Sequence, residues 1–268
     1  MIQRERIHPA LEWIEAALLG FFMLSASSFG VLLEHPGSPL RAALDDPFAR
    51  RALMGCAMGL TAIALIYSPL GKRSGAHMNP SVTLTFLRLG KVRATDALLY
   101  VVAQFLGGAA GMGLASLIFG RLLADPHVNY VVTRGEHGPA VAFAAEFAIS
   151  FVLMAVVLRV SSTPRLERLT GLCAGLLVAL YITFEAPLSG MSLNPARSFG
   201  SALLRSTQCA GAWMDFWVYL LAPLAGMGSA AFVYTSTSSA PPVRCAKLHH
   251  DNPHRCIFCG ANSRESLT

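Results

Sequence analysis

Apolar residues fall into six runs along the chain, separated by short polar segments. Each run is close to the length of roughly 20 residues that crosses a bilayer as a helix, so we predict an all-α membrane protein. The first run resembles a cleaved secretory leader, but its length and its acidic residues Glu12 and Glu15 favour a helix that is retained. The runs cover approximately residues 11–33, 52–70, 94–119, 140–160, 169–186 and 213–235.

A short polar phrase interrupts this pattern twice, as Asn79-Pro80-Ser81 and as Asn194-Pro195-Ala196. Asn is a strong helix N-cap, and Pro suits the first helical position, where no N–H is needed. Each copy closes a Gly-containing loop and therefore predicts a short half-helix that begins inside the membrane. Non-helical backbone at that depth must be covered by protein or line a watery cavity, and we expect a cavity here.

The order of runs and loops is the same in both halves of the chain. Each half has three runs, with the Asn-Pro loop after the second, so the second half must be inverted in the membrane. We therefore predict inverted repeats at about 8–125 and 138–235, with half-helices that meet N-terminus to N-terminus. Together they form a channel unit over residues 1–235, and residues 236–268 form a separate cytoplasmic tail.

Composition and charge agree with a bilayer as the solvent. Hydrophobic residues make up 54% of the chain and charged residues 13%, and the mean hydropathy is +0.51. Lys and Arg gather in the segments on the same side as the N-terminus, which by the positive-inside rule places both termini in the cytoplasm. The net charge of +6 implies no nucleic-acid partner, because anionic lipid accounts for it. We expect a multi-pass protein of the cell (inner or plasma) membrane, and no nucleophile–base pair or nucleotide-binding loop indicates an enzyme.

Four motifs in this order resemble the major intrinsic protein family, which comprises the aquaporins and glycerol facilitators. The resemblance covers about residues 10–235 and implies six transmembrane helices plus two re-entrant half-helices in a right-handed bundle. It also implies a homotetramer with one pore in each subunit. One departure is Ser81, where the family usually has Ala. The motifs are Ser-Gly-Ala-His-Met-Asn-Pro-Ser-Val-Thr (74–83), Ala-Gln-Phe-Leu-Gly-Gly (103–108), Ala-Glu-Phe (145–147) and Ser-Gly-Met-Ser-Leu-Asn-Pro-Ala-Arg-Ser-Phe-Gly (189–200).

Asn79, Asn194 and Arg197 are the first candidates for the pore. The two amides would donate hydrogen bonds to a passing solute, and the positive ends of two facing half-helices would repel protons and cations. The alternative is that both Asn residues are only helix caps. A guanidinium within a membrane segment is expensive, so Arg197 indicates function. The resemblance makes it the arginine of the outer constriction, and the alternative is a side chain that reaches the headgroups.

Other residues at the pore constriction determine which solutes can pass. Alignment with the family places Ile182, Met191 and either Met58 or Gly59 in the constriction, the last depending on one residue of slack. Water-selective members commonly have His in the place of Ile182, so this mouth is more hydrophobic than a water filter. Ser198, where glycerol-conducting relatives typically have Asp, points to water instead. We predict a passive channel for water and other small uncharged solutes, with a glycerol or hydrogen peroxide facilitator as the alternative.

Two acidic residues, Glu15 and Glu146, occupy related positions in the two repeats. In the family such carboxylates brace the loops by accepting backbone N–H groups, and His77 and Gln104 are expected to be structural hydrogen-bonding residues as well. The alternative is a proton relay, as in an ion-coupled small-solute transporter. A relay needs a titratable partner at helical spacing, and the sequence has none there.

The tail lies outside the resemblance and contains Cys and His residues at close spacing. Cys256-x2-Cys259 resembles a metal knuckle, and Cys245 with His249 or His254 would complete a tetrahedral zinc site. We name Cys245, His249, Cys256 and Cys259 as candidate ligands. The alternative is a disordered or peripheral tail. The channel itself requires no cofactor.

Overall fold

The computed structural model describes residues 9–207, 211, 213–250 and 254–260, and within this part of the chain all regular secondary structure is helical. The elements are α1 (Pro9–Glu34), α2 (Pro39–Ala43), α3 (Pro47–Tyr67), α4 (Pro69–Ser74), α5 (Pro80–Arg88), α6 (Ala94–Phe119), α7 (Arg121–Ala124), η1 (Asn129–Val131), α8 (Pro139–Ser161), η2 (Glu167–Leu169), α9 (Thr170–Phe184), α10 (Ala186–Ser189), α11 (Pro195–Ser206) and α12 (Phe216–Ser236).

Six described helices are long and apolar enough to cross a membrane, which confirms the predicted all-α membrane fold. They are α1, α3, α6, α8, α9 and α12, one for each apolar run. Helix α6 has the bounds expected from the sequence. Helix α12 begins at Phe216 rather than at residue 213, because residues 213–215 form a turn.

The helices pack as an inverted pair of repeats. Helix α1 packs along α6 in the first repeat, α8 packs along α12 in the second, and α3 packs along α9 between the repeats. Small residues allow these close approaches: a Cβ atom added to Gly111 would lie 2.6 Å from the carbonyl oxygen of Gly20. Between α3 and α9 the approach requires glycine on both helices, because a Cβ atom added to Gly59 or to Gly175 would lie 2.6 Å from the carbonyl oxygen of the other.

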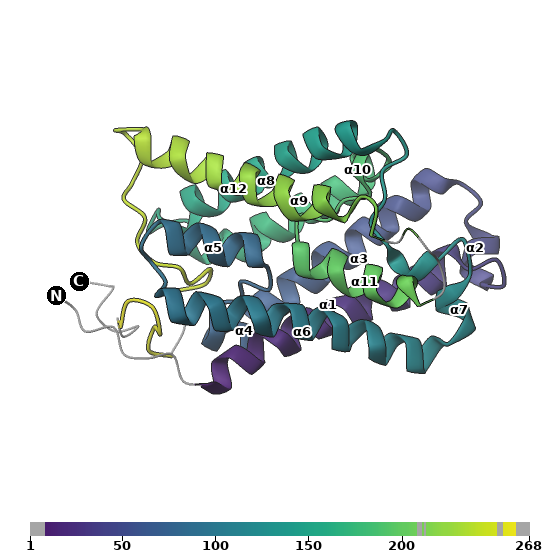
Figure 1. Cartoon of the computed structure of the whole chain (residues 1–268). Coiled ribbons are helices and arrows are strands. Elements are labelled where there is room, and N and C mark those ends of the chain that lie inside the picture. The colour runs from purple at the N-terminus through teal and green to yellow at the C-terminus, as the bar shows by residue number, and fades with distance from the viewer. Residues whose placement is uncertain (1–8, 208–210, 212, 251–253, 261–268) are drawn as a thin grey trace.

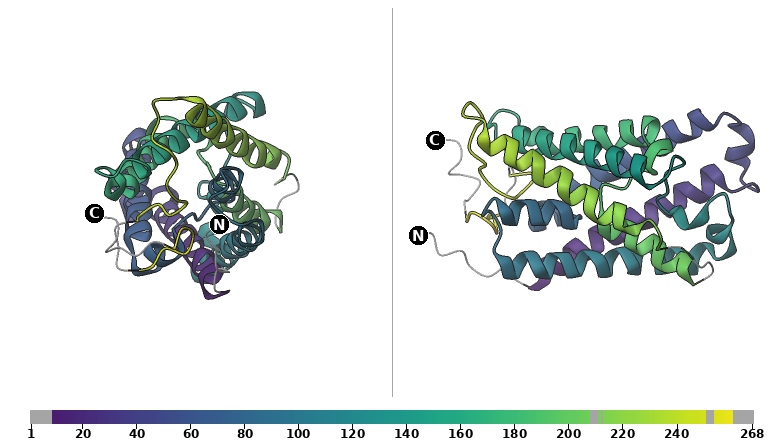
Figure 2. Two further views of the ribbon diagram at one scale, coloured as in Figure 1. Left: turned by 90° about the vertical axis from the view of Figure 1, so that its left-hand side faces the viewer. Right: turned by 45° about the horizontal axis from the view of Figure 1, so that its top comes forward.

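The half-helices α5 and α11 lie inside the bundle. Each contacts both α6 and α12, so each half-helix is held by the last long helix of both repeats. In Figure 1, α5 lies in the left half of the molecule and α11 in the right half, with their starting ends towards the middle. The left panel of Figure 2 views the bundle end-on and shows the yellow tail crossing the end nearest α5.

Candidate functional site

The two Asn residues join the half-helices at the centre of the molecule. The Asn79 Oδ1 atom accepts a 2.8 Å hydrogen bond from the Ser81 N–H, and Asn194 Oδ1 accepts one of 3.0 Å from the Ala196 N–H. Their amide nitrogens donate crosswise: Asn79 Nδ2 to the Leu193 carbonyl at 2.8 Å, and Asn194 Nδ2 to the Met78 carbonyl at 2.7 Å. Pro80 and Pro195 occupy the first helical turns, where Pro costs no hydrogen bond.

The crossed hydrogen bonds use only one N–H donor of each Asn side-chain amide. Each NH₂ group has two N–H donors, so Asn79 and Asn194 each retain one beyond the crossed bond. Both residues are at least 90% buried, and both line an internal cavity, which is described below. Each side chain therefore caps its own half-helix, ties the two loops together and presents a donor group to the cavity.

The loops before the half-helices have the same unusual backbone. In the first loop Gly75, Ala76 and Met78 have φ values of 97°, 56° and 49°. In the second, Gly190, Met191 and Leu193 have values of 85°, 53° and 60°. Left-handed conformations cost a non-glycine residue about 1–2 kcal/mol each, so the surroundings must hold them.

Glu15 and Glu146 provide that support. Glu15 accepts backbone N–H bonds from His77 at 3.1 Å and from Met78 at 2.6 Å. Glu146 accepts the equivalent bonds from Ser192 at 2.5 Å and Leu193 at 2.8 Å. The loop serines also donate to these carboxylates, Ser74 at 2.7 Å and Ser189 at 2.9 Å.

Further hydrogen bonds surround the first loop. Gln104 Nε2 donates to Glu15 at 3.0 Å and to Thr83 Oγ1 at 3.1 Å. The ring of His77 makes hydrogen bonds through Nδ1 to Thr83 Oγ1 at 3.0 Å and through Nε2 to the Ala246 carbonyl at 2.8 Å. His77 and Gln104 thus belong to the hydrogen-bond network of the loop, and His77 also connects it to the tail.

A cavity of about 310 Å³ runs past both Asn residues. Of the constriction candidates, Met58, Ile182, Met191 and Arg197 line it, and Gly59 does not. Gly59 faces α9, where an added Cβ atom would lie 2.6 Å from the Gly175 carbonyl oxygen. The position left open by the sequence is therefore Met58, and the expectation of Gly59 as a pore residue is corrected by the packing of α3 on α9.

Arg197 lies one turn into α11 and belongs to a polar cluster. Its Nη1 atom donates to Thr133 Oγ1. Thr133 also contacts Ser198 Oγ at 2.9 Å, and Ser198 contacts Ser192 Oγ at 2.6 Å. Sequence reasoning missed Thr133, because it lies in an irregular segment far from Arg197 along the chain and matches no motif.

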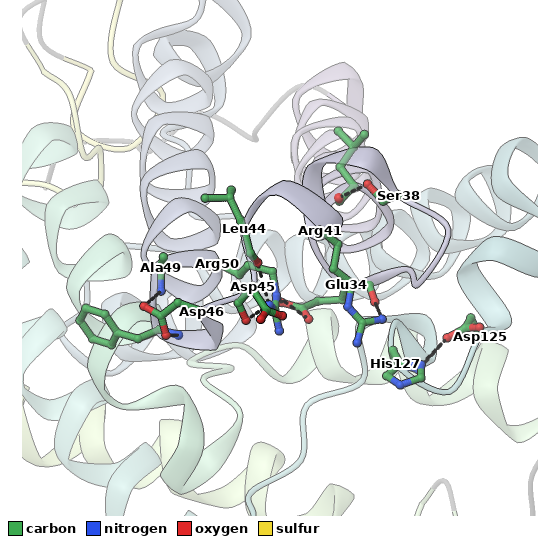
Figure 3. Close-up of polar contacts among 12 residues, drawn as sticks. Glu34, Ser38, Arg41, Leu44, Asp45, Asp46, Ala49, Arg50, Asp125 and His127 are labelled. Carbon is green, nitrogen blue, oxygen red and sulfur yellow. Dashed lines mark hydrogen bonds and ion pairs between the residues drawn. The ribbon is translucent and has the colours of Figure 1, made fainter.

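We define the arginine-side mouth by Glu34, Arg51 and Arg197, which line the cavity beyond the Asn residues. Figure 3 shows the polar contacts around its rim, where the ends of α1 and α3 meet. Arg50 pairs with Glu34 at 3.3 Å and donates to the Leu44 and Asp45 carbonyls at 2.9 Å each. These bonds tie the α1–α3 connection to the end of α1 and the start of α3.

At the opposite end the tail covers the bundle. We define the tail-side mouth by Ile66, Val157 and Leu248, which line the same cavity near the ends of α3 and α8 and in the tail. Leu248 is buried, and its N–H donates to the Gly75 carbonyl at 3.3 Å. Sequence reasoning missed Leu248 because no local pattern connects a tail residue to the pore.

Four tail residues form a group of potential metal ligands: Cys245, His250, Cys256 and Cys259, whose ligand atoms all lie within 4.8 Å of one another. The sequence pointed to His249, with His254 as the alternative, and the structure corrects this to His250. Neighbouring residues in an extended segment point in opposite directions. The ring of His249 lies edge-on to Tyr67 instead, with 4.9 Å between centroids.

The donors of this group suit a soft cation. Cys245 Sγ lies 3.3 Å from Cys256 Sγ, and His250 Nε2 lies 3.2 Å from Cys259 Sγ. Tetrahedral zinc with Zn–S bonds near 2.3 Å places its ligand atoms about 3.7 Å apart, so small shifts would complete such a site.

Inverted repeats, two half-helices and a cavity between their starts define the class of membrane proteins with a re-entrant-loop pore. The sequence profile of the major intrinsic protein family matches residues 15–234, and the chain belongs to that family. Aquaporin NIP1-2 of Arabidopsis thaliana is 35% identical over 180 residues, covering 66% of this chain and 59% of the relative. Aquaporin NIP1-2 of Oryza sativa subsp. japonica is 37% identical over 190 residues, covering 67% and 58%.

The match covers about three fifths of the length of these relatives. Among solved structures, the aquaglyceroporin from Plasmodium falciparum has the same fold, with a TM-score of 0.66 at 21% identity. That alignment covers 87% of this chain and 98% of the aquaglyceroporin.

Proposed function

We propose that this protein is a passive channel for water and other small uncharged solutes that excludes protons and ions. The observation that carries the proposal is the meeting of two Asn-headed half-helices on one cavity, with their amides crossed between the loops. The family relatives named aquaporins support the same function.

The geometry accounts for passage without protons. Each half-helix start has about half a positive charge, so the centre of the cavity opposes cations. A water molecule that accepts from both Asn79 and Asn194 turns its oxygen lone pairs towards them. It then cannot accept a proton from its neighbour, and a hydrogen-bonded relay of protons is interrupted. Arg197 adds a full positive charge at the arginine-side mouth.

Substrate choice rests on the side chains around the cavity. Met58, Ile182 and Met191 are apolar, and Met is pliable, so this part favours solutes that are partly apolar. That observation supports glycerol or hydrogen peroxide as a second candidate substrate for the same pore.

We assign Glu15, Glu146, His77 and Gln104 to support of the loops rather than to proton transfer. Both carboxylates are fully buried, and each is surrounded by loop donors. Protonating either one would disrupt the backbone bonds that hold its loop. An ion-coupled transporter, the alternative from another class, is therefore disfavoured, and no catalytic role is assigned to any residue.

Stopped-flow measurements on proteoliposomes test the function. We expect water permeability well above that of empty liposomes, with no proton uptake coupled to it. Light scattering with glycerol and a fluorescent peroxide sensor inside the vesicles rank the other solutes. Ile182→His adds a donor at the constriction and should lower the glycerol-to-water ratio by roughly tenfold. Permeability equal to that of empty liposomes, together with proton-coupled uptake, would refute the channel.

We further propose that both termini are cytoplasmic, that the protein resides in the cell membrane and that it forms homotetramers. Large apolar residues on the outer faces of the helices support contact with lipid or another subunit: Leu117 is 85% exposed and Leu60 is 66% exposed. Reporter fusions at the C-terminus test the orientation. Cross-linking in membranes tests the tetramer, and a ladder that stops at the monomer would contradict it.

For the tail we propose zinc as the ion held by Cys245, His250, Cys256 and Cys259. Three thiolates and one imidazole form a ligand set typical of structural zinc sites. We assign residues 236–268 as a tail that follows the channel unit 1–235 and packs against it, because Val243, Ala246 and Phe258 belong to the same hydrophobic core as the helices. Elemental analysis of the purified protein should find one zinc per chain.

A further inference from the structure

The tail is built into the tail-side mouth rather than lying beside it. In the last turn of α12, Tyr234 donates its hydroxyl to the Pro241 carbonyl at 2.8 Å, where the chain turns back over the bundle. The segment then reaches the first Asn loop, where Ala246 accepts from His77 and Leu248 donates to Gly75. Figure 1 shows this yellow segment beside α5, at the same end of the molecule.

Leu248 lines the cavity at its tail-side mouth, on the route that a solute would take. It lines the central cavity together with Ile66, Val157 and Ala174, and all four side chains are apolar. Water in such a constriction loses hydrogen-bond partners, and hydrophobic constrictions gate pores by expelling water. In this conformation Leu248 therefore opposes flow at the tail-side mouth.

The Cys/His group determines whether this segment stays in place. Two of its members, Cys245 and His250, flank Leu248 along the chain, so an ion bound to both closes a short loop around Leu248. The other two, Cys256 and Cys259, flank Phe258. The Phe258 ring stacks on His77 in parallel planes with 5.4 Å between centroids.

Phe258 also packs directly against the first Asn loop. A Cβ atom added to Gly75 would lie 2.7 Å from the Phe258 ring. One metal ion would therefore hold two anchors, Leu248 in the lumen and Phe258 on the loop. The segment also packs into the hydrophobic core through Val243, Ala246 and Phe258, and the ion would add to these contacts by closing two short loops, which offsets part of the entropy of ordering the segment.

We propose that the tail is a zinc-clamped plug: zinc bound by Cys245, His250, Cys256 and Cys259 holds Leu248 in the tail-side mouth and closes the pore. Loss of the zinc releases the segment and opens the pore. This inference rests on the proposed channel function, and the experiment below separates the two.

The experiment uses the full-length protein in proteoliposomes, with zinc measured by mass spectrometry and water permeability by stopped flow. Zinc-loaded protein should conduct slowly, so the high water permeability expected of the channel is that of the chelator-treated protein. A membrane-permeant chelator should raise its permeability by roughly fivefold or more, as expected when a hydrophobic constriction is removed, and added zinc should reverse the rise.

Variants separate the clamp from the plug. Cys256→Ser should lose zinc and conduct quickly in either condition. Leu248→Ala should retain zinc and still conduct quickly, which a purely structural role for the metal would not produce. Cys56→Ser, which removes an exposed thiol on α3, is the matched control and should behave like the unmodified protein.

The outcomes distinguish the two proposals. If no variant conducts above empty liposomes under any condition, the proposed channel function is wrong, and the plug proposal is refuted together with it. If the unmodified protein conducts equally with and without zinc, and Leu248→Ala matches it, the channel stands and the plug is overturned. A protein that binds no zinc under metal-replete conditions, or whose Cys245 and Cys256 form a disulfide, overturns the zinc clamp.

Discussion

The loop at residues 74–79 and the loop at residues 189–194 have one architecture in two different surroundings. Both have left-handed residues at matching places, both are held by a buried glutamate, and both end in Asn followed by Pro. The first loop faces the tail, with Phe258 against Gly75. The second faces the irregular segment that contains Thr133 and Arg134, and it leads into Arg197.

The comparison distinguishes the features that both repeats share from the features that are found at only one mouth of the cavity. The shared parts place two half-helix starts and two amides on one cavity, and this shared centre would account for the proposed exclusion of ions. The additions differ in chemistry: a cation and hydroxyl groups at one mouth, a leucine and a metal-ligand group at the other. Selectivity and control would thus reside in the parts that break the symmetry.

Removing the glutamate supports should have the largest effect. In Glu146→Gln and Glu15→Gln, the amide NH₂ group faces backbone N–H donors, so we expect each change to lower the free energy of unfolding by about 4 kcal/mol. The loss should be greater for Glu15, which also accepts from Gln104. Thermal unfolding in detergent measures this. Glu136→Gln, on an exposed loop, is the control, and an unchanged midpoint for Glu146→Gln would refute the support role.

Alanine at the loop glycines should affect the two loops unequally. In Gly190→Ala the new Cβ meets the backbone of Arg134, which cannot move aside, so we expect a loss of about 3 kcal/mol. In Gly75→Ala it meets the Phe258 ring, which can leave. We expect that variant to lose about 1 kcal/mol and to conduct water faster.

Gly90→Ala separates strain from collision in this pair. Its φ of +67° is positive like those of the loop glycines, but nothing lies within 4 Å of an added Cβ. Unfolding midpoints and stopped-flow rates of the three variants complete the test. Equal stability losses for Gly190→Ala and Gly75→Ala would show that the surroundings of the two loops do not differ in stiffness.

Removing the charge at the arginine-side mouth should weaken ion exclusion without unfolding the protein. A cation 4 Å from a guanidinium is opposed by about 4 kcal/mol at an effective dielectric constant near 20. The half-helix dipoles remain in Arg197→Val, so we expect roughly a thirtyfold rise in proton flux, equivalent to about 2 kcal/mol. A pH-sensitive dye inside proteoliposomes measures it. Arg121→Val, at an exposed site, should leave the flux unchanged.

Two tyrosines at equivalent positions of the two repeats should give the smallest losses of stability. Tyr219 donates to the Ser189 carbonyl at 2.6 Å, and Tyr100 donates to the Ser74 carbonyl at 2.8 Å. Phe at either position leaves one carbonyl without that donor, so we expect losses of about 1 kcal/mol each. Chemical denaturation measures both. Losses that differ by more than twofold would show that the repeats do not hold their loops equally.

Much of the fold could be read from local patterns. Six apolar runs became six long helices, because length and hydropathy suffice to specify a membrane span. The half-helices began at Asn79 and Asn194, because Asn-Pro specifies a helix start without help from distant residues. Glu15 and Glu146 could be placed by the symmetry of the two repeats.

Only the tertiary structure decided which side chains reach the cavity. Met58 lines it and Gly59 does not, because the packing of α3 on α9 determines the rotation of the helix. His250 joins the cysteines in place of His249, and Leu248 reaches the pore, because contacts with the first Asn loop position the tail. A run or a cap is encoded by adjacent residues, whereas these placements depend on contacts between residues far apart in the chain.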